Sequence, residues 1–267
     1  MFADIPENTF EGSNFKKTQF VPFFNGANIR LRVLDHKAHS IQKHFINRSK
    51  LSVLCLGEEA CPICENNRRL VQANPKSKRN QIPGMIFRQS RFMTNVFNRT
   101  PVKTAPSGKV VYPINNKFPS ADPVTGEVLI DIEAAPLNEI QVLERGSTLF
   151  SQLNLVHNSV VDEVGQPLGL WNYDISISVV GSGKDMVTNV TALSHLNDAV
   201  AYRTEDLYDL ETVGIRLSPD EIIRVLEGVS LRDIFAVRKT EDTEAIAKEV
   251  EVISEEVKAS VSNIFDA

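Results

Sequence analysis

The residues best suited to chemistry are three cysteines and a histidine in the first quarter of the chain. All three cysteines fall in the pattern Cys55-x5-Cys61-Pro62-Ile63-Cys64, and His44 stands eleven positions before the first of them. Three thiolates and one imidazole fill the four positions of a tetrahedral Zn²⁺ site, and a short Cys-x-x-Cys knuckle is typical of such sites. The alternative, three reduced thiols packed in a core, would not require such clustering. The spacing therefore predicts one structural Zn²⁺ ion.

The histidine ligand is less constrained by the pattern than the cysteines are. His44 lies in a segment that could pair as a strand with residues 51–54, which would carry its imidazole toward Cys55. His36 and His39 are also within range and remain alternatives to His44. Four protein ligands leave no open position for water, which favours a structural metal over a catalytic one.

Charge is distributed unevenly along the chain, whose formal net charge is −5. Residues 1–117 carry 19 Lys and Arg against 7 Asp and Glu, whereas residues 118–267 carry 10 against 27. Such a separation is typical of a nucleic-acid-binding segment followed by an acidic one.

The first half is expected to form two strands with basic residues, over residues 28–34 and 85–98. Arginines alternate with apolar residues in the first, and arginines are interleaved with phenylalanines in the second. In the first strand we expect the apolar face to be buried and the opposite face to present Arg30 and Arg32. Single-stranded nucleic acid needs this mixture, because cations neutralise its phosphates and rings stack on its bases. For each phenylalanine, core packing is the alternative role. The candidates on these strands are Arg30, Arg32, Phe87, Arg88, Arg91 and Phe92.

The second half contains further strands and one helix. Residues 138–143 and the alternating stretch 171–179 read as strands, and residues 147–157 have helical spacing. The chain then turns at Gly-Ser-Gly-Lys, residues 181–184, and returns through residues 186–191; this turn lacks the spacing of a phosphate-binding loop. About five strands with a helix before the last hairpin predict a β-rich α+β fold built on a small OB-type barrel.

Two regions are expected along the chain. Residues 1–203 form the OB-like core with a zinc subdomain at about residues 36–82, and residues 204–267 form a helical, acidic C-terminal region. A capping box, Ser218-Pro219-Asp220-Glu221, opens a helix in that region.

The last residues of the chain have two alternative roles. Between Glu241 and Lys258, seven acidic residues stand against two lysines, with apolar residues at helical spacing. This segment either packs on the domain as a helix or frays, or it competes with DNA for basic groups and offers Ile264-Phe265-Asp266 to partner proteins.

Composition and the first residues place the chain among soluble globular proteins. It is 42% apolar and 24% charged. No run approaches the roughly 20 apolar residues of a membrane span, and the acidic first residues do not read as a signal peptide. We therefore expect that the protein does not associate with a membrane and that it resides in a reducing cytoplasm.

The order of these features resembles that of the single-stranded DNA-binding proteins of tailed phages, and is similar to the T4-type helix-destabilising replication proteins. The shared features are a basic and aromatic N-terminal segment (Phe15-Lys-Lys-Thr-Gln-Phe-Val-Pro-Phe-Phe24), a strand with alternating arginines, the His44…Cys55…Cys61-Pro-Ile-Cys64 pattern, a late hairpin and an acidic C-terminus. The resemblance implies a zinc ribbon inserted into an OB-fold, with His44, Cys55, Cys61 and Cys64 as ligands. It adds Tyr112 to the six candidates for the DNA groove.

That resemblance implies a non-catalytic protein that coats single-stranded DNA during phage DNA replication, recombination and repair in the cytoplasm of the infected bacterium. Replication and recombination proteins would bind its acidic C-terminus, and copies of the chain would associate on DNA. One alternative is a zinc-ribbon interaction module of a transcription or virion assembly. Another is a zinc-ribbon nuclease or primase subunit, although the acidic pairs Asp131/Glu133 and Asp162/Glu163 sit in no convincing motif.

Overall fold

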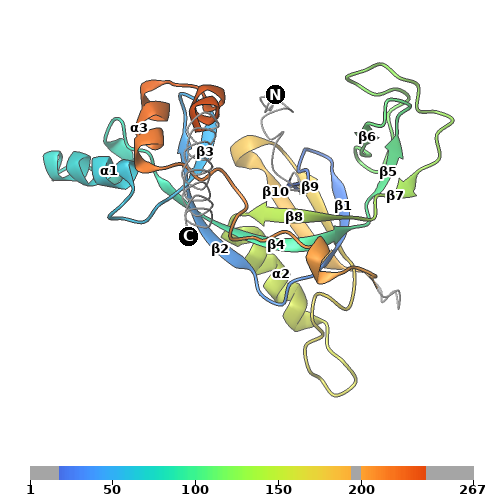
Figure 1. Cartoon of the computed structure of the whole chain (residues 1–267). Coiled ribbons are helices and arrows are strands. Elements are labelled where there is room, and N and C mark those ends of the chain that lie inside the picture. Colours follow the sequence, from blue (N-terminus) through green and yellow to red (C-terminus); the bar gives the residue numbers. More distant parts are fainter. Residues whose placement is uncertain (1–17, 194–199, 239–267) are drawn as a thin grey trace, which may run out of the picture. The chain divides into compact units, whose positions relative to one another are not determined.

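The computed structural model describes residues 18–193 and 200–238, which form an α+β structure rich in antiparallel sheet (Figure 1). These residues divide into two compact units. The smaller unit, called the cysteine unit below, comprises His44–Phe87 and residues 216–238. The larger, called the sheet unit, comprises residues 18–43 and Arg88–Ile215. Residues 216–238 thus belong to the same unit as the cysteines.

The sheet unit is built on five antiparallel strands in the order β10-β9-β1-β4-β8. The first part of β2 also pairs with β4. In the described part of the chain no pairing joins β10 to β8, so the sheet is open. The bounds of these strands are Asn28–Val33 for β1, His39–Ile46 for β2, Arg88–Asn98 for β4, Glu139–Arg145 for β8, Ile175–Val180 for β9 and Val187–Ala192 for β10.

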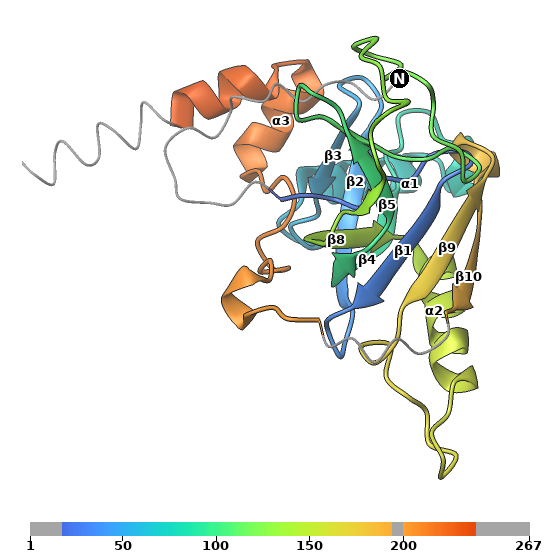
Figure 2. The same ribbon diagram turned by 90° about the vertical axis from the view of Figure 1, so that its right-hand side faces the viewer.

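One face of this sheet forms the main core with helix α2, Ser147–Ser159. The helix contacts β4, β8 and β10 (Figure 2). Leu149 and Leu153 of the helix lie in one buried cluster with the apolar residues of β1 and β9. Because strand residues alternate between faces, Ile29 and Leu31 enter this core while Arg30 lies on the other face, as the alternation predicts.

A second, smaller sheet follows β4 in the chain (Figure 1). It has the order β6-β5-β7, with β5 at Pro101–Thr104, β6 at Val110–Val111 and β7 at Ala135–Pro136. The long connection between β6 and β7 contains only isolated bridges. Pro, Gly and Asn residues in this connection favour such an irregular course.

The cysteine unit contains the end of β2, strand β3 at Leu51–Leu54 and helices α1 and α3. The expected pairing of the His44 segment with residues 51–54 is confirmed. Helix α1, Pro62–Ala73, contacts α3, Pro219–Glu227, and residues 231–238 are also helical. Ser218 and Glu221 close the predicted capping box of α3, and Gly228 ends the helix with φ of +105°.

Two expectations about elements need correction. The strand expected over residues 171–179 begins only at Ile175, because residues 170–173 form turns and bends. Helix α1 was not expected, since its many polar residues read as a solvated run after the cysteine knuckle.

The acidic segment after residue 238 lies outside the described residues, among which no helix has the length and apolar character needed to cross a membrane. Short 3₁₀ turns occupy Arg79–Gln81, Gly183–Asp185 and Thr204–Asp206.

Candidate metal centre and basic side-chain clusters

The four predicted metal ligands come together inside the cysteine unit. His44 lies on β2, Cys55 directly follows β3, and Cys61 and Cys64 flank the start of α1. The ligand atoms of these four residues all lie within 4.8 Å of one another. The prediction that His44 completes the cluster is therefore confirmed at the level of geometry, whereas His36 packs against Trp171 in the sheet unit.

The distances within the cluster fit one tetrahedral ion. Cys55 Sγ and Cys64 Sγ are 3.6 Å apart, and Cys64 Sγ lies 3.3 Å from His44 Nε2. Ligand atoms at about 2.1–2.3 Å from a tetrahedral metal must be separated by roughly 3.5–3.8 Å. Soft thiolates with one imidazole are a donor set that suits Zn²⁺. The residues present therefore fit a bound metal.

Contacts behind His44 fix the orientation of its imidazole. His44 Nδ1 lies 3.3 Å from the carbonyl oxygen of Ile86, and the side chain is fully buried. Asn67 holds that peptide in turn, since its Nδ2 donates to Ile86 O at 2.7 Å and its Oδ1 accepts from Ile86 N at 3.1 Å. A proton on Nδ1 shared with Ile86 leaves the lone pair of Nε2 for a metal, which is how ligating histidines are usually held.

The electrostatics of the thiols follow from their crowding at the start of α1. Burial raises the pKa of the Cys61 thiol, but backbone N–H groups of Cys64, Leu56 and Ile63 lower that pKa below 9.0 overall. Burial first, and the neighbouring thiols Cys55 and Cys61 after it, together raise the pKa of Cys64 from 9.0 to about 12. Thiolates this close repel one another, and a divalent cation removes that repulsion.

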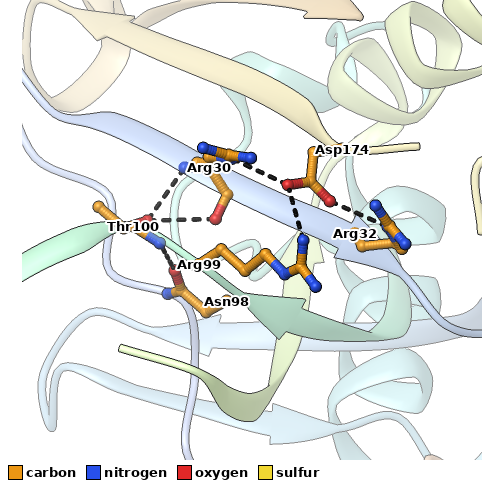
Figure 3. Close-up of polar contacts among 6 residues, drawn as sticks. All are labelled: Arg30, Arg32, Asn98, Arg99, Thr100 and Asp174. Carbon is orange, nitrogen blue, oxygen red and sulfur yellow. Dashed lines mark hydrogen bonds and ion pairs between the residues drawn. The ribbon is translucent and has the colours of Figure 1, made fainter. Parts of the chain in front are cut away.

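A buried carboxylate collects three arginines on the sheet unit (Figure 3). Asp174, just before β9, is fully buried and accepts from Arg30 Nε at 2.8 Å and from Arg32 Nε at 2.9 Å. Arg99 Nη1 lies 3.5 Å from the same carboxylate. The expectation that Arg32 presents its guanidinium group is wrong, because its side chain is 4% exposed and lies opposite Asp174. Arg30 remains about one-third exposed.

Arg91 has an amide oxygen and not a carboxylate as its hydrogen-bond partner. Arg91, on β4, donates to Gln89 Oε1 at 2.9 Å. Phe92, the next residue, packs on Phe150 of α2 with ring centroids 5.5 Å apart, and its register partner on β8 is Arg145. Arg91 and Phe92, two of the predicted candidates, therefore lie close to Arg145, which was not among the candidates.

The remaining candidates lie in different surroundings. Phe87, in the cysteine unit, is 47% exposed, and Arg88 opens β4 as an exposed residue. Tyr112 is half-buried and meets Phe24 edge to face at a centroid distance of 6.2 Å. Burial raises the pKa of Tyr112, and Gln141 opposes the shift by hydrogen bonding. Tyr112 thus packs at the edge of the core.

A cavity of about 280 Å³ also opens in the sheet unit. It is lined by residues of β1, its following loop and α2, and by Trp171, whose ring lies 4.0 Å from that of His36. The ring centroid of His157, on α2, lies 6.4 Å from that of Trp171. The one sequence feature that could have pointed to this cavity is Trp171, the single tryptophan of the chain.

Sequence reasoning missed Asp174, Arg99 and Arg145. Asp174 lies within the strand expected over residues 171–179, where the alternation puts it on the polar face, yet it is fully buried against arginines. Arg99 stands just outside β4, so the alternation within that strand could not assign it to a face. Arg145 ends β8, where an arginine before a glycine reads as a turn. Its position shows only when the register of β8 against β4 is known.

Comparisons with known proteins add no family to these observations. No protein-family model matches the chain, and no curated protein matches it.

Proposed function

We propose that this protein binds single-stranded DNA and catalyses no reaction. The observation that carries the proposal is the group of basic and aromatic residues at the start of β4. Arg88 is exposed, and Arg91 and Phe92 follow it half-buried; among the described residues no carboxylate is bonded to Arg91. Cations and rings in succession along one strand are what a flexible polyanion with stacking bases requires.

The strand order supports an OB-type fold for the sheet unit. An OB-fold is a five-stranded, partly open Greek-key barrel whose second and third strands form the binding face. Taken in chain order, β1, β4, β8, β9 and β10 are five strands with α2 between the third and the fourth. Their spatial order, with the first strand central and β8 and β10 at the ends, suits such a barrel before closure. On this assignment β4 and β8 are the binding strands.

The mechanism of binding is electrostatic and stacking. Phosphates displace counterions as they approach Lys and Arg side chains, so affinity falls as salt rises. Bases that stack on exposed rings such as Phe87 add roughly 1–3 kcal/mol each, with weak sequence preference.

The Cys/His cluster has a structural role in this proposal. Zn²⁺ held by His44, Cys55, Cys61 and Cys64 would contribute folding energy to the cysteine unit. The biological setting that we propose is phage DNA replication, recombination and repair in the cytoplasm of an infected bacterium. There the acidic C-terminus would bind replication and recombination proteins, and copies of the chain would associate on DNA.

A salt titration tests the proposed function. Binding of the full chain to a fluorescent oligo-dT is measured between about 50 and 300 mM salt, beside a duplex of equal length and an RNA oligonucleotide. We expect tight binding to the single strand that weakens steeply with salt, and much weaker binding to duplex. Equal or absent binding to both DNAs would refute the proposal.

The same sample addresses the alternatives. A zinc-ribbon interaction module would bind a protein partner and have no affinity for single strands. A nuclease would cleave DNA in the presence of a divalent cation. Asp162, in one of the acidic pairs considered for that role, instead accepts from the backbone N–H groups of Val164 and Gln166, which makes it part of a loop turn.

A further inference from the structure

Arg145 holds an unusual position at the end of β8. Its Nε is buried and has no hydrogen-bond partner in the described part of the chain. The guanidinium carbon lies 3.6 Å from the centroid of the Phe23 ring, so the cation rests on an aromatic face. A buried donor without an acceptor costs free energy, so the position calls for a compensating group.

The carboxylate next to Arg145 in the chain is bonded to another cation. Glu144, the preceding residue, accepts from Lys43 Nζ at 2.7 Å. Arg145 Nε therefore has no acceptor among the described residues.

A second arginine increases the positive charge at this place. Arg91 Nη1 lies 3.9 Å from the point where a Cβ of Gly146 would stand. Burial first, and the charge of Arg91 second, lower the pKa of Arg145 to about 10, with Glu144 opposing. Helix α2 starts directly after Gly146 without a side-chain cap, so its N-terminal dipole adds to the same field.

We propose that Arg91 and Arg145, the arginine pair, together bind one phosphate group of a nucleic-acid backbone. The anion would offset the repulsion between the two cations and accept hydrogen bonds from their guanidinium groups, of which the Arg145 Nε–H has no acceptor among the described residues. The Phe23 ring supports one face of the Arg145 guanidinium group. The planar guanidinium groups of Arg91 and Arg145 can each donate two hydrogen bonds to the oxygens of a phosphate. This inference rests on the proposed function and assigns a residue pair on the expected binding strands to the phosphate backbone.

The test is the salt dependence of binding by charge-removing variants. Arg145→Met keeps an aliphatic side chain over Phe23 but removes the positive charge. Arg91→Met likewise removes the charge of the second arginine and keeps an aliphatic side chain. Each is expected to bind oligo-dT about 10-fold more weakly at low salt. Each should also lower the slope of log K against log salt by about 0.7, the value of one phosphate contact on a single strand.

A matched control is Arg203→Met in the same unit. Arg203 is 74% exposed and pairs with Glu205 and Asp206, so its loss should change neither affinity nor slope. If Arg145→Met does not fold, as judged by circular dichroism, Arg91→Met carries the test. Unchanged affinity and slope in the arginine-pair variants, with normal binding by the wild type, would overturn this inference and leave the proposed function standing.

Thermal unfolding in inorganic phosphate further distinguishes failure of the proposed function from failure of the proposed phosphate site. At matched ionic strength, phosphate should raise the Tm of the wild type relative to chloride more than it raises the Tm of Arg145→Met. A wild type that binds no DNA but keeps this difference would refute the proposed function and support an anion site. Equal Tm shifts in both proteins and unchanged DNA binding would refute the site.

Discussion

Asp174 compensates more positive charge than its own carboxylate carries, because Arg30, Arg32 and Arg99 all approach it in a buried place. Asp174→Asn keeps the volume and removes the charge. We expect a loss of about 3–5 kcal/mol in the free energy of unfolding, since Arg32 would stay buried without a counter-charge. Urea denaturation followed by circular dichroism measures this loss.

The control for Asp174 is an exposed ion pair of the same unit. Glu205 and Arg203 have side chains that are about 70% exposed and 2.9 Å apart. Glu205→Gln should change the stability by no more than about 1 kcal/mol. Equal effects of the two substitutions would contradict the view that burial gives the Asp174 cluster its importance.

Cys61→Ser tests the metal centre. Cys61 is buried and caps α1 with its backbone, so serine preserves the chain direction and removes one soft ligand. We expect the wild type to carry one zinc per chain by elemental analysis and the variant to lose it, with Tm lower by about 10 °C or more. Ser77→Ala, at an exposed position of the same unit, should leave zinc content and Tm unchanged. Equal zinc content in Cys61→Ser and the wild type would exclude the site.

At the scale of elements, the β9–β10 turn depends on one glycine. Gly181 has φ of +82°, and a Cβ there would lie 2.4 Å from the carbonyl oxygen of Asp185. Gly183, in the same turn, has φ of +59° and open space around it. Gly181→Ala should therefore cost about 3 kcal/mol and Gly183→Ala about 1 kcal/mol, because only the first adds a backbone clash to the strain. Comparison of the two unfolding midpoints checks this order, which a reversed ranking would contradict.

Helix α3 contributes a pH-dependent part of the stability. Hydrogen bonding to Arg238 is the first cause that lowers the pKa of Glu221 below 4.5, and Ser218 lowers it further. A carboxyl whose folded pKa is depressed stabilises the fold above its ordinary pKa and loses that effect as pH falls. Glu221→Gln should thus lower Tm at pH 7, and the difference from wild type should shrink as pH falls below 4.5. Glu227→Gln, exposed on the same helix, serves as the control; a difference independent of pH would refute the ion-pair explanation.

Local sequence patterns predicted those helices and strands in which apolar residues recur with the period of the element because one of its faces is buried. The alternation in β1, the helical spacing of α2 and the capping box of α3 each correspond to an observed element. The cysteine cluster was also predictable, because its four ligands, three cysteines and one histidine, lie close in sequence. Pairings between distant segments were not, since they depend on register: Asp174 meets Arg32 across strands about 140 residues apart in the chain. Burial of Arg32 followed from that pairing, which the alternation within one strand cannot reveal.

At the scale of the whole molecule, the uneven charge suggests that the acidic end of the chain regulates DNA binding. Residues 239–267 carry eight acidic and three basic residues, while residues 1–117 are strongly basic. We propose that this acidic segment competes with phosphates for Lys and Arg side chains, and we expect the competition to weaken as salt screens it.

Deleting residues 239–267 tests this competition. The shortened chain should bind oligo-dT roughly 10-fold more tightly at about 50 mM salt, and the gain should vanish near 0.5 M, where the Debye length falls below about 5 Å. A control chain in which the eight acidic residues are replaced by Asn or Gln should behave like the deletion, because charge and not length is the cause. If the neutralised chain binds like the wild type while the deletion binds more tightly, the segment acts by steric exclusion. If neither change alters the affinity at low salt, the segment does not compete with DNA, and the acidic residues must act on other partners.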